Sequence, residues 1–189
     1  RGAHEHAVGQ HVQLRCGDVR RELEALGGRA RARLRCGRAP VAATAKRILL
    51  TGCPSGGVIN KVGKVIEEHG GVIVCLDDCS GERANRLLVD EDADDILRAI
   101  SDRYLAVNCS VMTPNDARID NTAAMARAYR ADGVVEVVLQ ACHTFNVESS
   151  RVQRRMEEEG IPYLKLETDY SAGDGGQVGT RLAAFIEML

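Results

Sequence analysis

Short apolar runs alternate with stretches of helical periodicity from about residue 46 to the C-terminus. Each run has the length of a strand, and the apolar residues that follow it recur every three or four positions, as on one face of a helix. The runs predict strands at about 47–52, 72–75, 134–139 and 163–167, and the periodic stretches predict helices at about 57–69, 82–90, 94–104, 117–131, 147–159 and 175–189. In the helix at 94–104 we expect Ile96, Leu97 and Ile100 to be buried.

The order of these elements predicts the fold class. Alternation of strands and helices favours an α/β fold in which one four-stranded parallel sheet is flanked by helices, in a flavodoxin-like or Rossmann-like three-layer arrangement. The run Val134–Leu139 is apolar at nearly every position, as expected for an inner strand covered on both faces. We therefore expect it to be central or next to central in a domain that spans residues 46–189.

Residues 1–45 differ in composition from the rest of the chain. They carry nine Arg and four acidic residues, whereas residues 46–189 carry 16 basic and 23 acidic residues. The segment contains no Lys, Ile, Phe or Tyr, and it predicts at most one helix, near residues 19–26. We interpret it as an atypical basic tail that is disordered, an artefact of truncation or reading frame, or a remnant of a linker.

The overall composition excludes several classes of function. The chain has only four Tyr, two Phe and no Trp, which argues against stacking on nucleic acid. It has no apolar run of the length of a membrane span and no apolar segment typical of a secretory signal. Seven cysteines, an odd number, sit mostly beside strands. This usage indicates metal or redox chemistry in the cytoplasm rather than a disulfide framework.

Thiols and polar side chains follow the predicted strands at equivalent points. Because the carboxyl ends of parallel strands meet at one edge of the sheet, where ligands bind in such folds, we expect these residues to converge there. Thiolates are soft donors that suit iron–sulfur clusters. The residues expected at this edge are Cys53, Cys75, Cys79, Cys142, His143, Asp169 and Tyr170.

Several of these residues have a second interpretation. Cys75 lies in an apolar run and could be a small buried core residue, and Cys109 lies in an irregular link between two helices. His143 could be a ligand, a proton donor or a hydrogen-bond donor to a sulfur, or have no role. The glycine-rich turn at 52–57 fits neither a Walker loop nor the dinucleotide fingerprint, although the helix that follows could bind an anion.

Five segments resemble the 2-hydroxyacyl-CoA dehydratase family, D-component, and most closely its branch of double-cubane iron–sulfur proteins. The resemblance covers about residues 46–189, and the cysteine in the first turn favours this branch. The segments are GCPSGGVINK at 52–61, VCLDDCSG at 74–81, NCSVMTPN at 108–115, VVEVVLQACHTFNVES at 134–149 and YLKLETDYSAGDGGQVGTRLAAFIEML at 163–189.

The resemblance implies a chemistry and a set of partners. Members are about twice this long, and a further N-terminal α/β domain supplies additional cysteines, so this chain resembles their last domain. An ATP-hydrolysing iron–sulfur activator delivers low-potential electrons to clusters between the domains. Dehydratases then form a ketyl radical that lets a 2-hydroxyacyl-CoA lose water, and the double-cubane branch reduces small molecules. The implied cofactor is a 4Fe–4S or double-cubane cluster, with Cys53, Cys79 and Cys142 as ligands, followed by Cys109 and Cys75.

The family's architecture also predicts what the cluster edge should look like in this chain. If a missing domain or partner subunit normally covers that edge, Val111, Met112 and Phe145 should be exposed there. Two alternatives remain open: a zinc- or thiol-stabilised structural domain, and a metal-free flavodoxin-like binding module.

Overall fold

The computed structural model describes residues 16–39, 41–54 and 56–189. The chain divides into two compact units, Arg1–Ala43 and Thr44–Leu189. In the first unit, helix α1 (Cys16–Arg35) is longer than the helix expected near 19–26. The interpretation of residues 1–45 as an atypical tail stays a prediction, and residues 1–15 lie outside the described part of the chain.

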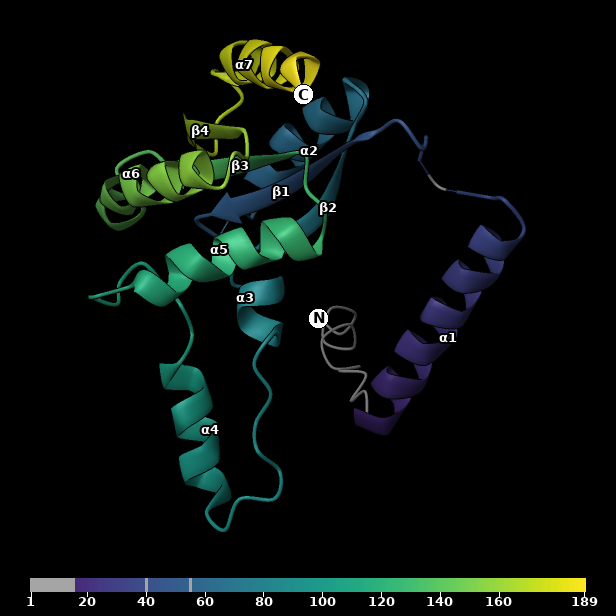
Figure 1. Ribbon diagram of the computed structural model, residues 1–189, viewed down its shortest axis with the longest axis vertical. Helices are drawn as coiled ribbons and strands as arrows, with labels where there is room; N and C mark the ends of the chain where they lie inside the picture. The colour runs from purple at the N-terminus through teal and green to yellow at the C-terminus, as the bar shows by residue number, and fades with distance from the viewer. Residues whose placement is uncertain (1–15, 40, 55) are drawn as a thin grey trace, which may run out of the picture. The chain divides into compact units, whose positions relative to one another are not determined.

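The second unit contains the four-stranded parallel sheet that the sequence predicts. Its strands are β1 (Lys46–Gly52), β2 (Gly71–Asp77), β3 (Gly133–Leu139) and β4 (Tyr163–Thr168), in the order β2-β1-β3-β4 (Figure 1). All three pairings are parallel, and β3 pairs with β1 on one side and β4 on the other. The α/β class and the inner position of β3 are therefore confirmed.

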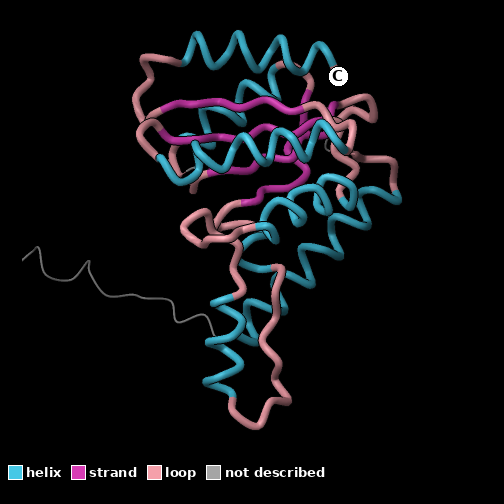
Figure 2. The backbone as a smooth tube through the Cα atoms, turned by 60° about the vertical axis from the view of Figure 1, so that its left-hand side comes forward, coloured by secondary structure: helices cyan, strands magenta, loops and turns pink. Residues whose placement is uncertain are grey.

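Helices cover both faces of the sheet. Ile48 and Leu50 of β1 pack with α2 (Val58–Glu68) and α7 (Gly175–Met188), whereas Leu49 packs with α5 (Asp116–Ala128) and α6 (His143–Glu158). Successive strand side chains point to opposite faces, so this run of three apolar residues serves both layers. Figure 2 shows the resulting stack of helices about the strands.

The segment between β2 and α5 departs from the prediction. It holds a one-turn helix, α3 (Glu82–Asn85), and a second helix, α4 (Ile96–Leu105), which projects away from the sheet (Figure 1). No residue of α4 is buried, and Leu97 is 73% exposed, so the expectation that Ile96, Leu97 and Ile100 are buried is wrong. Helical periodicity predicts the helix but not a partner for its apolar face.

Two boundary shifts affect the functional edge. Strand β2 continues to Asp77, so Leu76 and Asp77 belong to the strand and not to the loop after it. Helix α6 begins at His143 rather than at about 147, which makes Cys142 its N-cap residue. Both shifts place chemically active side chains on regular structure. No described helix is both long enough and apolar enough to cross a membrane.

Candidate functional site at the carboxyl edge of the sheet

The turn after β1 depends on a glycine. Gly52 has φ 120°, and a Cβ atom at this position would lie 2.0 Å from the carbonyl oxygen of Val137. The next amide, that of Cys53, donates a 2.8 Å hydrogen bond to the same oxygen. The absence of a side chain at Gly52 therefore lets β1 run close to β3 and positions Cys53 beside the end of β3.

Cys53 is a buried thiol. Its side chain is 1% exposed and packs with Val138 and Phe145, and its Sγ accepts a 3.3 Å hydrogen bond from the amide of Leu139. Burial raises the pKa of Cys53 to about 12, although the Leu139 hydrogen bond acts in the opposite direction. The thiol is therefore protonated at neutral pH.

Cys142 contacts Cys53 from the start of α6. It is the N-cap residue of that helix, is partly exposed, and packs against the cluster that contains Cys53. Burial acts to raise its pKa, but hydrogen bonds from the Phe145 amide, the Thr144 hydroxyl and the Cys53 thiol lower the pKa below its ordinary value. A helix N-terminus favours a thiolate in the same way. The edge thus holds a protonated thiol that donates to a more acidic one.

Two other expected ligands, Cys79 and Cys109, lie on loops. Cys79 is exposed on the loop after β2, where Asp78 accepts hydrogen bonds from the Ser80 and Gly81 amides. Cys109 is partly exposed, and its neighbour Ser110 is linked to Thr144 by a 3.2 Å hydroxyl contact.

Cys75 and His143 have simpler environments. Cys75 is buried in the core cluster with Leu49 and Met125, and burial raises its pKa to about 12. His143 is exposed at the first position of α6. Nothing in these surroundings distinguishes Cys75 from a core residue.

The described residues do not form a complete cluster site. A cubane takes three or four thiolates, and no three His, Cys, Asp or Glu side chains of the described chain are close enough together to hold a metal ion. What the sheet edge provides is one thiol pair, Cys53 and Cys142. Any cluster would need ligands beyond this pair.

A buried ionic network lies behind the thiol pair, and the sequence did not reveal it. Arg118 is 1% exposed and donates to Glu136 at 2.7 Å and to Glu148 at 2.6 Å. Asn115 also donates to Glu148, and the Tyr163 hydroxyl donates to Glu136. Burial, and then the Glu136 charge, raise the pKa of Tyr163, so its hydroxyl stays a donor. The only sequence signal was a glutamate inside the apolar run of β3, which requires a buried partner.

A second arginine connects this network to β1 and β2. Arg83 donates to both the side chain and the carbonyl of Asp77 and to the carbonyl of Gly52. The guanidinium carbons of Arg83 and Arg118 lie 5.4 Å and 4.9 Å from the centre of the Phe145 ring. The expectation that Phe145 is exposed is therefore wrong, because two cations and Cys53 enclose its ring. Val111 and Met112 are exposed, as expected.

Lys61 fixes the loop at the end of β4. Its Nζ donates to the Thr168 hydroxyl at 2.7 Å, to the carbonyls of Asp169 and Ser171, and to the Asp174 carboxylate at 2.5 Å. These hydrogen bonds from Lys61 and Thr168 lower the pKa of Asp174. The loop holds Asp169 and the exposed Tyr170 at the carboxyl edge, where the sequence placed them.

Most of the chain matches one protein family. Residues 11–189 match the family described as 2-hydroxyglutaryl-CoA dehydratase, D-component. The chain belongs to this family. The match confirms the resemblance carried by the five segments, and it reaches further toward the N-terminus than they do.

Three relatives are similar to this chain. They are "Putative dehydratase subunit YjiM" of Escherichia coli, 49% identical over 144 residues; the (R)-phenyllactyl-CoA dehydratase beta subunit of Clostridium sporogenes, 27% identical over 145; and the (R)-2-hydroxyglutaryl-CoA dehydratase subunit beta of Acidaminococcus fermentans, 24% identical over 143. The matched regions cover 76%, 76% and 71% of this chain, and 37%, 38% and 38% of the respective relatives. The chain thus spans less than two fifths of the length of the relatives that it matches.

Proposed function

We propose that this α/β domain supplies part of the iron–sulfur site of a 2-hydroxyacyl-CoA dehydratase-type enzyme. The observation that carries the proposal is the contact between Cys53 and Cys142 at the carboxyl edge of adjacent strands. The sheet holds both thiols rigidly, and thiolates are the usual protein ligands of such clusters. Membership of the dehydratase family supports the choice of an iron–sulfur cluster over other metals.

The remaining ligands would come from loops of this domain and from outside it. Cys79 and Cys109 lie on loops beside the same edge, and Cys109 is tied to the start of α6 through Ser110 and Thr144. Further thiolates would come from another domain or from a partner subunit. The exposed side chains of Val111, 70% accessible, and Met112 lie next to Ser110 and would pack against that partner.

The reaction that we propose follows from the family. An ATP-dependent iron–sulfur activator protein would reduce the cluster, and the enzyme would then dehydrate a 2-hydroxyacyl-CoA or, as in the double-cubane branch, reduce a small molecule. Two of the relatives are named as beta subunits of acyl-CoA dehydratases, which supports the first reaction and a multi-subunit assembly. This reaction would take place in the reducing cytoplasm, where free thiols persist.

Anaerobic iron and sulfide analysis tests the proposal. The chain should be co-expressed with the portion of the Escherichia coli relative that it does not match, and compared with the chain alone. We expect a brown, iron-loaded complex and an isolated chain that holds little iron. The variants Cys53→Ser and Cys142→Ser should each lower the iron content of the complex, whereas Cys36→Ser, an exposed thiol of the first unit, should not.

The same analysis distinguishes the two alternative functions. A colourless protein with stoichiometric zinc would identify a structural metal domain. A complex that lacks metal and tolerates serine at every loop cysteine would identify a metal-free binding module. Full iron loading with Cys53 and Cys142 both replaced would refute the ligand assignment.

A further inference from the structure

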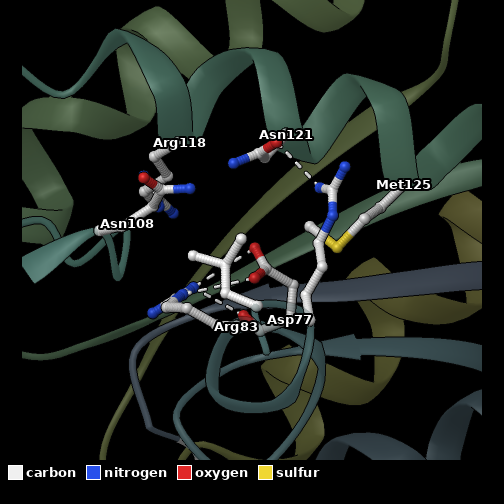
Figure 3. Close-up of a pocket in the computed structure, with 9 residues that line it drawn as sticks. Asp77, Arg83, Asn108, Arg118, Asn121 and Met125 are labelled. Carbon is white, nitrogen blue, oxygen red and sulfur yellow. Dashed lines mark hydrogen bonds and ion pairs between the residues drawn. The ribbon is translucent and has the colours of Figure 1, made fainter. Parts of the chain in front are cut away.

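A cavity of about 110 Å³ is lined by residues from the end of β2, from α3 and the chain after it, from the link after α4, and from α5. Figure 3 shows Arg118, Asn121 and Met125 on α5, Asn108 beside Arg118, and Asp77 and Arg83 on the opposite side of the cavity. The exposed residues Arg86 and Leu87 also line it, so this side opens to solvent. The cavity contains none of the thiols and is separate from the pair formed by Cys53 and Cys142.

The walls of the cavity offer more hydrogen-bond donors than the protein uses. Arg86 donates one hydrogen bond, from Nη1 to the Asn121 side-chain oxygen at 2.9 Å, which leaves the Asn121 amide nitrogen available. The Asn108 side chain has no hydrogen-bond partner within residues 16–39, 41–54 and 56–189. Polar groups that are withdrawn from bulk solvent are rarely left unpaired in native proteins.

The charge of the lining favours an anion of a particular kind. Three arginines line the cavity, but Arg83 pairs with Asp77, and Arg118 pairs with Glu136 and Glu148. Among the described residues, Arg86 is the lining arginine that has no carboxylate partner. A single negative charge would balance Arg86, whereas a dianion would leave one charge uncompensated. Planar guanidinium and amide groups match the two oxygens of a carboxylate. A liquid water molecule occupies about 30 Å³, so the volume admits a ligand of only a few non-hydrogen atoms.

We propose that this cavity is a binding site for a small monocarboxylate, held by Arg86, Asn121 and Asn108. Arg86 and Asn121 form the open end and set the charge of the ligand, and Asn108 forms the inner end. The site shares Arg83 and Arg118 with the wall around Phe145, so an occupied cavity would also stiffen the back of the thiol pocket. The proposal goes beyond the cluster function and does not depend on it.

Line broadening of the methyl resonance of acetate, titrated with the full chain, tests the site. We expect saturable binding in the millimolar range, and loss of one charge-assisted hydrogen bond should weaken it about tenfold in Arg86→Gln and in Asn121→Leu. Arg86 is exposed, so its replacement should leave the fold intact, which circular dichroism checks. The control is Arg154→Gln, an exposed arginine of α6 that removes the same charge elsewhere and should leave acetate binding unchanged.

Three results would overturn the proposal. The first is the absence of saturable acetate binding to the wild-type chain. The second is equal weakening in Arg154→Gln and Arg86→Gln, which would mean that general surface charge attracts the anion. The third is inorganic sulfate, a dianion at neutral pH, binding as tightly as acetate, which would contradict the preference for a single negative charge.

Discussion

Replacing Arg118 with Met should strongly destabilise the domain, because it removes a cation that pairs with two buried carboxylates. Within the described chain, Glu136 and Glu148 form their salt bridges with this one side chain, at 2.7 Å and 2.6 Å. Glu136 is fully buried and Glu148 is 8% exposed, so water cannot replace the lost partner. Met has a similar length and is apolar, so the change removes charge with little loss of volume.

The magnitude follows from the cost of an unpaired buried charge. Removal of one member of a buried ion pair typically costs about 3–5 kcal/mol of unfolding free energy. Asn115 still donates to Glu148, and Tyr163 still donates to Glu136, which keeps the expected loss within that range. The second variant, Arg118→Met with Glu136→Gln, removes one orphaned charge and keeps an acceptor for Tyr163. It should recover at least about 1 kcal/mol relative to the single variant.

Chemical unfolding in urea, followed by far-ultraviolet circular dichroism, measures these differences. The control is Arg151→Met, because Arg151 pairs with Asp116 on the surface, where both side chains are about half exposed or more. Exposed pairs contribute at most about 1 kcal/mol, so the control should unfold nearly as the wild type does. A loss below about 1 kcal/mol in Arg118→Met, or no recovery in the double variant, would show that Glu136 and Glu148 are not dependent on Arg118.

Three further predictions test other parts of the structure. Gly52→Ala should cost more than about 3 kcal/mol in thermal unfolding, because the new Cβ meets the Val137 carbonyl and φ is strained; an unchanged melting temperature would contradict the close approach of β1 and β3. Lys61→Met should lower the free energy of unfolding by about 2 kcal/mol at neutral pH. Because the pKa of Asp174 is lowered in the folded state, this loss should shrink as pH falls below about 4 and Asp174 takes up a proton. A loss of unfolding free energy that does not change with pH would contradict the role of Asp174. Iodoacetamide should label Cys142 before Cys53, because the pKa of Cys142 is lowered and that of Cys53 is raised, and peptide mass spectrometry that finds Cys53 modified first would reverse this assignment.

The strand layout could be predicted because its signals are local. Four apolar runs of strand length, separated by helical patterns, fix a parallel sheet whatever the details of packing. The nearly continuous apolar run of β3 likewise predicts its inner position in the sheet. Cys53 and Cys142 could be expected together, because both follow strands that turn out to be neighbours.

Other features depend on long-range contacts that no local pattern contains. The apolar stripe of α4 has the same period whether or not a partner covers it, so the sequence could not show that Leu97 is exposed. Both Cys75 and Cys53 are buried, but Cys75 lies inside β2 and packs in the core with Leu49, whereas Cys53 follows β1 and packs beside Cys142. The sequence predicted Phe145 to lie in a loop. Because α6 begins at His143, Phe145 lies in its first turn and is buried.

The central claim is that Cys142 and Cys53 bind iron, and replacing one sulfur with selenium tests it most directly. X-ray absorption at the selenium edge should be recorded on a Cys142→selenocysteine variant of the chain, purified anaerobically in complex with the unmatched portion of the Escherichia coli relative. We predict a spectrum with iron as a direct neighbour of selenium, and loss of part of the bound iron when Cys53→Ser is added. A selenium spectrum with only light neighbouring atoms, in a complex that is nevertheless loaded with iron, would contradict the claim.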